Sequence, residues 1–171
     1  MDQSELHERE ISLLNEFEHG RLPLMIFLRS IRELREGCIV EPDPRLGKAV
    51  VAAFDRHTEG RDLMAMILSI EGFDVVVSGR ESRTEDIIQL CKDPEVKVLC
   101  LSIQTTLNLN VTELVTRLKE EGIRDRIVFN MGGSPVTKRI ADEAGCDVFA
   151  TTAVESVRMI KHNVLERVDR V

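Results

Sequence analysis

The sequence lacks the features with which proteins hold nucleic acids or cross membranes. Its 171 residues include no tryptophan and no tyrosine, aromatic residues make up 4%, and the formal net charge is −7. Nucleic-acid binding relies on basic patches and on aromatic side chains that stack on bases, so we expect no nucleic-acid partner. The longest apolar run, residues 22–28, is far shorter than the ~20 residues that span a bilayer, so we expect no membrane segment. The N-terminus is acidic and polar, unlike a secretory signal, which favours a cytoplasmic location.

Cysteine is sparse and scattered. The four cysteines stand at positions 38, 91, 100 and 146, and no Cys-x-x-Cys pair occurs. Zinc sites and redox-active dithiols need closely spaced thiols, so neither is predicted. Cys100 falls inside an apolar segment, where a free cysteine usually acts as a small hydrophobic residue.

Residues 1–37 have the spacing of two helices. Ser4 is the expected N-cap of the first helix, and Gly20 is expected to end it. Pro23 suits the first turn of the second helix. That helix carries a broad apolar stripe, which would pack on the rest of the chain or on a second copy of it. The stripe consists of Leu24, Phe27, Leu28, Ile31 and Leu34.

Prolines at positions 42 and 44 mark a linker, since each biases the residue before it away from helix. We expect an N-terminal helical segment over residues 1–40 and a larger domain over residues 45–171. In the larger domain, short apolar segments alternate with helical patterns, which is typical of a parallel sheet covered on both faces. Five strands are expected, over residues 49–54, 74–77, 96–102, 126–130 and 147–150. Five helices are expected, over residues 60–71, 83–91, 111–120, 136–144 and 153–167.

This alternation predicts an α/β fold with a flavodoxin-like (Rossmann-like), doubly wound, five-stranded parallel sheet. Several classes of protein share that architecture, so the fold alone names no function. A receiver domain is disfavoured because it needs an aspartate at the end of the third strand, where Ser102 stands. A dinucleotide-binding domain is disfavoured because the first turn has no Gly-x-Gly-x-x-Gly loop.

The most informative stretch is Phe-Asp-Arg-His-Thr-Glu-Gly, residues 54–60, between the first strand and its helix. Ligands of open α/β sheets bind at the carboxyl ends of strands, where Asp55, His57 and Gly60 would lie. A neutral imidazole is a good ligand for a transition metal, and a carboxylate can hold its second nitrogen. Gly60 would let the helix approach a bulky ligand closely. Taken alone, the pattern also fits an ordinary loop with a capping aspartate.

Two further strand ends carry small or polar residues. The third strand leads into Leu-Ser-Ile-Gln-Thr-Thr, residues 101–106. The fourth leads into Asn-Met-Gly-Gly-Ser-Pro-Val-Thr, residues 130–137, whose paired glycines leave room for a ligand lying along the sheet edge.

These three elements, in this order, resemble the cobalamin-binding domain family. The segment from Gly132 to Asp147 is most similar to the corrinoid proteins of methyltransferase systems, and the resemblance covers the chain from the linker onward. It implies a base-off, His-on cobalamin, with His57 as the lower axial ligand of cobalt and Asp55 orienting its ring. The implied cofactor-binding residues are Asp55, Arg56, His57, Thr58, Glu59, Gly60, Ser102, Gln104, Thr106, Gly132, Gly133, Ser134, Phe149 and Thr151.

In that family a serine at the end of the third strand lines the pocket for the cofactor's nucleotide tail. The resemblance therefore implies that Ser102 and Thr106 hydrogen-bond the tail and that Gly132 and Gly133 make room for it. Gln104 occupies a position where the family usually has leucine.

The resemblance also implies a role. The chain would carry a methyl group on cobalt between partner methyltransferases, with a reductive activator as a further partner, as a cofactor-carrying component rather than a complete enzyme. Two alternatives stay open: the small subunit of an adenosylcobalamin-dependent mutase, and a storage, delivery or sensing module for cobalamin. The N-terminal region is shorter than the helical cap of the family, so we expect the upper face of cobalt to be largely open. The N-terminal helices are then available for a homodimer contact.

Overall fold

The computed structural model describes residues 1–105 and 110–171 and divides into two compact units, Met1–Pro42 and Asp43–Val171. The first unit is a pair of helices, α1 (Gln3–Glu18) and α2 (Leu24–Arg35), so the two expected N-terminal helices are confirmed. The carboxylate of Asp2 accepts a hydrogen bond from Glu5 N at 2.8 Å and caps α1. Ser4 lies inside the helix, so its prediction as the N-cap was wrong. Pro23 precedes the first turn of α2 instead of lying within it.

The two helices pack through aromatic and apolar side chains. The rings of Phe17 and Phe27 stack with their centroids 4.8 Å apart. Glu10 and Arg35 form a largely buried ion pair between the helices. Three residues of the expected stripe are buried and two are half-buried; the buried ones are Phe27, Leu28 and Ile31.

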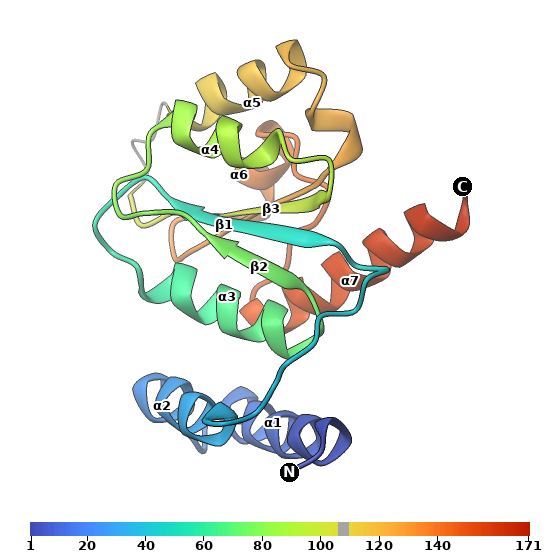
Figure 1. Cartoon of the computed structure of the whole chain (residues 1–171). Coiled ribbons are helices and arrows are strands. Elements are labelled where there is room, and N and C mark those ends of the chain that lie inside the picture. Colours follow the sequence, from blue (N-terminus) through green and yellow to red (C-terminus); the bar gives the residue numbers. More distant parts are fainter. Residues whose placement is uncertain (106–109) are drawn as a thin grey trace. The chain divides into compact units, whose positions relative to one another are not determined.

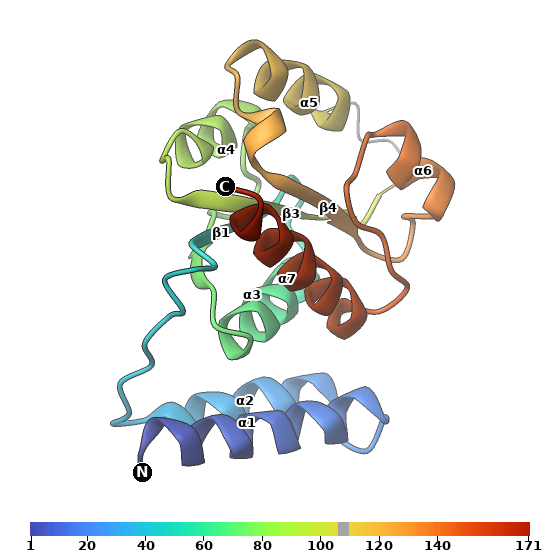
Figure 2. The ribbon, with the colours of Figure 1, turned by 90° about the vertical axis from the view of Figure 1, so that its right-hand side faces the viewer.

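The second unit contains a four-stranded parallel sheet in the order β2-β1-β3-β4. The strands are β1 (Lys48–Ala53), β2 (Asp74–Val77), β3 (Val96–Ser102) and β4 (Val128–Gly132). The helices are α3 (Glu59–Ile70), α4 (Thr84–Cys91), α5 (Asn110–Glu120), α6 (Lys138–Glu143) and α7 (Ala153–Asp169). Helices α4 and α5 lie over one face of the sheet, and α3 and α7 lie over the other (Figure 1, Figure 2). Because both faces are covered, β1 and β3 are almost wholly buried.

The expected fifth strand is absent from the described part of the chain. Val148 makes only an isolated parallel bridge to Asn130 on β4. The reason lies one residue earlier, because the backbone N–H of Asp147 donates to Phe129 O at 2.8 Å while its carboxylate accepts from Phe129 N at 2.8 Å. In a fifth strand, a backbone carbonyl would accept the hydrogen bond from Phe129 N at the edge of β4. Here the Asp147 carboxylate accepts that hydrogen bond instead. The prediction of five strands was wrong by this one.

Two other boundaries moved for local reasons. A 3-10 turn, η1 (Arg124–Arg126), occupies the start of the expected fourth strand, so β4 begins at Val128. Helix α6 begins after Thr137, whose hydroxyl accepts from Ile140 N at 3.3 Å, and it is shorter than expected.

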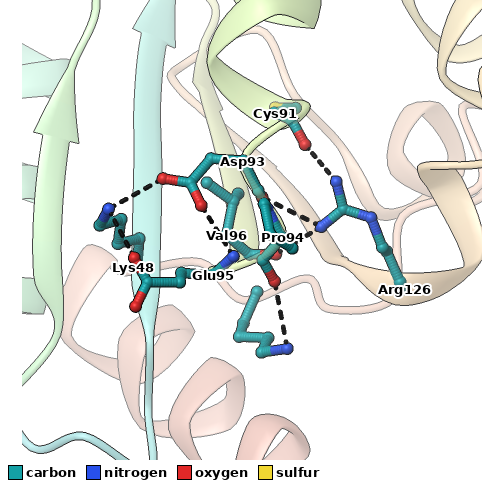
Figure 3. A network of polar contacts seen from close by, with 8 residues as sticks. Lys48, Cys91, Asp93, Pro94, Glu95, Val96 and Arg126 are labelled. Carbon is teal, nitrogen blue, oxygen red and sulfur yellow. Dashed lines mark hydrogen bonds and ion pairs between the residues drawn. The ribbon is translucent and has the colours of Figure 1, made fainter.

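The amino edge of the sheet is held by a polar network (Figure 3). Lys48 on β1 forms ion pairs with Asp93 at 2.8 Å and with Glu95 at 2.9 Å. The guanidinium of Arg126 donates to three backbone carbonyls: Cys91 at the end of α4, Asp93 in the loop after it, and Val96 at the start of β3. These contacts fix the α4–β3 connection far from the opposite, carboxyl edge.

At the carboxyl edge, the strand register brings three strand ends into one row. Ala53 on β1 pairs with Ser102 on β3, and Ser102 pairs with Gly132 on β4. The loops that follow β1, β3 and β4 therefore leave the sheet side by side, as open parallel sheets require for a ligand site. No helix of the described residues is long and apolar enough to cross a membrane.

Candidate functional site

A cavity of about 430 Å³ opens where these strand ends meet the start of α7. Its lining comes from β1, α3, β3, the segment after β4, and the first turn of α7. Eight residues expected from the sequence line it: Gly60, Ser102, Gln104, Gly132, Gly133, Ser134, Phe149 and Thr151. The structure thus brings together residues that are up to 91 positions apart, counting from Gly60 to Thr151.

Sequence reasoning missed part of the lining. Cys100 and Met64 contribute from the sheet and from α3, and Ser156 contributes from the first turns of α7. Cys100 could have been predicted from the sequence, because residues two apart in a strand share a face and Ser102 was already assigned to the site. Ser156 could not have been predicted in this way, because Thr152, one helical turn before it, was not among the expected residues, although it caps α7 and also lines the cavity.

Ser102 gives the clearest indication that the cavity could bind a ligand. Its side chain is buried, with 6% of the residue exposed, and its hydroxyl has no hydrogen-bond partner among the described residues. A buried hydroxyl without a partner costs free energy in the isolated chain, so a ligand atom in the cavity would supply the missing bond. Gly60 leaves this hydroxyl its space, since a Cβ there would come within 2.6 Å of Ser102 Oγ.

The paired glycines have different reasons to be glycine. Gly133 has a φ of +122°, and a Cβ on it would lie 1.8 Å from Ile103 O, so the fold itself forbids a side chain. Gly132 has an ordinary φ, and a Cβ on it would meet no atom of the described residues within 4 Å. Because Gly132 lines the cavity, the space that its absent side chain leaves belongs to the cavity.

The loop with His57 follows β1 at the same edge of the sheet, and His57 is not part of the cavity lining. Asp55 holds the loop through backbone contacts: its carboxylate accepts from His57 N at 3.0 Å and from Gln104 N at 3.2 Å. One carboxylate therefore ties the loop after β1 to the loop after β3. The His57 side chain is exposed. The orienting contact from Asp55 to the imidazole stays a prediction.

The other expected residues of this loop have structural positions. Arg56 forms an exposed ion pair with Glu81 at 3.1 Å. Thr58 occupies the N-cap position of α3 without a side-chain cap, and Glu59 is the first residue of that helix. Thr106 lies outside the described residues.

The site offers few groups that could bind a metal by themselves. No cluster of three or more histidine, cysteine, aspartate or glutamate side chains that could hold a metal occurs within residues 1–105 and 110–171. Burial raises the pKa of the Cys100 thiol above its ordinary value of 9.0, so this cavity residue is a neutral thiol near pH 7. A metal here would need to bring most of its ligands with it, as a macrocycle-bound ion does.

Comparisons with known proteins identify the family of the chain. The model of the B12 binding domain matches residues 47–158, and the chain belongs to that family. It is 30% identical over 159 residues to trimethylamine corrinoid protein 2 of Methanosarcina acetivorans, covering 86% of this chain and 73% of that one. The resemblance drawn from the sequence is thereby confirmed.

Two solved structures extend the likeness. The monomethylamine corrinoid protein of Methanosarcina barkeri superimposes with a TM-score of 0.63 at 25% identity, covering 90% of this chain and 76% of that one. A chain of the methanol:cobalamin methyltransferase complex from the same organism superimposes with a TM-score of 0.73 at 18% identity, covering 93% and 64%. At that identity the second likeness shows the fold alone.

Three observations of the structure fit a corrinoid. The unpartnered hydroxyl of Ser102 offers a hydrogen bond to a buried tail, and the space beside Gly132 gives such a tail room. The exposed imidazole of His57 stands at the same edge, at the end of β1. A corrinoid would bring most of the ligands of its metal ion with it, which fits a site without a metal-binding cluster among the described residues.

Proposed function

We propose that this chain is a corrinoid protein that carries a methyl group on cobalt between partner methyltransferases. The observation that carries the proposal is the buried, unpartnered hydroxyl of Ser102 in a cavity that Gly132 leaves open, at the strand edge where His57 lies. The similarity to methylamine corrinoid proteins supports the methyl-carrying role. Bound cobalamin supplies the methyl-transfer chemistry, and the protein supplies ligation and orientation.

In this proposal the cofactor binds base-off and His-on. His57 is the lower axial ligand, and its neutral imidazole nitrogen suits a transition metal. Ser102 hydrogen-bonds the nucleotide tail in the cavity, with Thr106 as a second donor, and Gly132 leaves the tail its space. Asp55 fixes the backbone of His57 through the two amide contacts and, by the sequence argument, also orients the ring.

The same proposal specifies partners and setting. In the cytoplasm, the chain would receive a methyl group from one methyltransferase and pass it to another. A reductive activator would return cobalt to its reduced state after oxidation. By the sequence argument, the chain would leave the upper face of cobalt largely open, which would suit a carrier that must enter two active sites. The N-terminal helices would hold a second copy of the chain.

The test is reconstitution with cobalamin followed by visible and electron paramagnetic resonance spectroscopy. We expect about one cobalamin per chain, since one sheet edge offers one such crevice. In the Co(II) form, protein grown with ¹⁵N-histidine should show coupling to one labelled nitrogen. His57→Ala should abolish this coupling while the tail still binds. His162→Ala, which changes an exposed histidine on α7, is the matched control and should leave it intact. If the intact ¹⁵N-histidine protein shows no coupling between Co(II) and a labelled nitrogen, the axial role of His57 is refuted.

A further inference from the structure

The loop that carries His57 makes hydrogen bonds to two neighbouring parts of the chain, and only one of them lines the cavity. On the cavity side, the Asp55 carboxylate bonds His57 N and Gln104 N. On the other side lies the loop between β2 and α4, residues 78–83. This second contact has no part in the expected site.

Backbone hydrogen bonds join the β2–α4 loop to the end of β1. Ser78 N donates to Val51 O at 2.9 Å, and Ser82 N donates to Ala53 O at 3.0 Å. Beyond the strand, Glu81 N donates to Asp55 O at 3.3 Å. The loop therefore continues the pairing of β1 past its last residue, up to two positions before His57.

The β2–α4 loop has its own internal support. The hydroxyl of Ser82 lies 2.7 Å from that of Ser78 and donates to Gly79 O at 2.7 Å. Both serines are buried. Glu81 adopts a φ of +49°, which a residue with a side chain adopts rarely, so the loop is held in one specific shape.

Arg61 connects this loop to the start of α3. Its guanidinium donates through Nη1 to Ser78 O at 2.7 Å. Through Nε and Nη2 it also donates to Asp62 Oδ1, at 3.0 and 2.9 Å. Only 11% of the Arg61 side chain is exposed, and the Asp62 carboxylate balances its charge. The planar guanidinium holds its Nη1 donor and its Nε and Nη2 donors in a fixed fork, so it makes both contacts in one geometry that a lysine ammonium would reproduce only in part.

We propose that Arg61 is a positioning residue for His57, an inference that rests on the axial role of His57 proposed above. Arg61 fixes the helix end of the His57 loop, while the β2–α4 loop fixes its strand end. The backbone of His57 is thereby ordered before cobalamin arrives. A ligand side chain on an ordered loop binds more tightly, because less conformational entropy is lost when the bond to cobalt forms.

The test compares Arg61→Met with Arg126→Met. Arg126 is the matched control, because its guanidinium also bonds backbone carbonyls and is half-buried, but it lies at the amino edge of the sheet. We expect Arg61→Met to lower the ratio of histidine-coordinated to uncoordinated Co(II) by about tenfold, the scale of one lost ordering contact. Arg126→Met should leave that ratio unchanged even if it lowers thermal stability. Arg61→Lys should restore part of the ratio.

A second measurement on the same variants needs no cofactor. Hydrogen exchange of the amides of residues 53–60 should be faster in Arg61→Met than in the parent chain and unchanged in Arg126→Met. Equal effects of the two variants on coordination would overturn the inference, because the cause would then be general stability. The inference would also be overturned if the parent chain shows ¹⁵N coupling and Arg61→Met has the same ratio of histidine-coordinated to uncoordinated Co(II) as the parent. Loss of coupling in the parent chain itself would instead overturn the axial role of His57, and this inference with it.

Discussion

At the scale of single residues, Gly132 and Gly133 separate what the fold needs from what the ligand needs. Gly133→Ala would place a Cβ 1.8 Å from Ile103 O at a φ of +122°, so we expect it to destabilise the chain strongly. Gly132→Ala meets no atom within 4 Å in the described part of the chain, so the thermal midpoint without cofactor should barely change.

Although Gly132→Ala should leave stability almost unchanged, we expect it to weaken the binding of cobalamin. A methyl group there would occupy cavity space, so Gly132→Ala should weaken cobalamin binding by about tenfold or more, the penalty typical of overpacking a fitted site. Thermal denaturation without cofactor and a spectrophotometric titration with cobalamin measure the two effects. A Gly132→Ala chain with normal uptake would mean that the tail does not pass beside Gly132.

The thiols give a second prediction at this scale. Burial raises the pKa of Cys91 and of Cys146 to about 12, and it raises the pKa of Cys100 as well. The thiolate is the reactive form, so these three cysteines should resist alkylation at pH 8. Half-buried Cys38 in the first unit should take the label alone. Mass spectrometry should find one label per native chain and four in urea; labelling of Cys100 before Cys38 would contradict this.

At the scale of elements, the strands show what the sequence could and could not predict. The strands at residues 74–77 and 96–102 were predicted to the residue, because apolar segments bounded by turn residues are local signals. The fifth strand failed because Asp147 uses its carboxylate to take the edge donor of Phe129, 18 residues away. A pattern of apolar residues carries no information about such a long-range side-chain contact.

The candidate site shows the same division. Three motifs placed six of the eight expected residues around the cavity, because parallel strands bring their carboxyl ends to one edge. Phe149 and Thr151, the other two, were expected from the family resemblance alone. The partner of the Asp55 carboxylate could not be predicted, since Gln104 N is 49 positions away and is an ordinary backbone amide. The role of Arg61 was invisible for the same reason, because Ser78 contributes only its carbonyl oxygen.

The amino edge gives a prediction of pH dependence. The hydrogen bond from Lys48 lowers the pKa of Asp93 below its ordinary value of 3.8. A lowered carboxyl pKa in the folded chain adds stability above the unfolded value, and this stability is lost as the pH falls through the folded value. Lys48→Met should therefore lower the urea midpoint more at pH 7 than near pH ~3, where Asp93 is protonated in unfolded chains. Equal losses at both pH values would show that packing of the Lys48 stem, and not its charge, matters here.

At the scale of the whole molecule, the two units divide the work of the proposed carrier. The second unit contains the whole matched domain and every described residue of the candidate site. The first unit contributes a helical hairpin with its own buried ion pair and aromatic contact. Its function in the proposal is contact with a second copy, and that function can be tested without touching the cofactor site.

The exposed side of α2 provides the substitution. Met25 is 64% exposed, and Ile26 beside it is also exposed, although both are large apolar residues. If a homodimer forms through this helix, their burial supplies part of its stability, and a charge there would be removed from water without a partner. We expect Met25→Glu to shift the chain from dimer to monomer in sedimentation velocity runs across a concentration series, with uptake of about one cobalamin per chain preserved. Met159→Glu, at an exposed methionine on α7, is the control and should leave the dimer intact. A parent chain that sediments as a monomer at every concentration would refute the homodimer, and a dimer that survives Met25→Glu but not Met159→Glu would move the contact to α7.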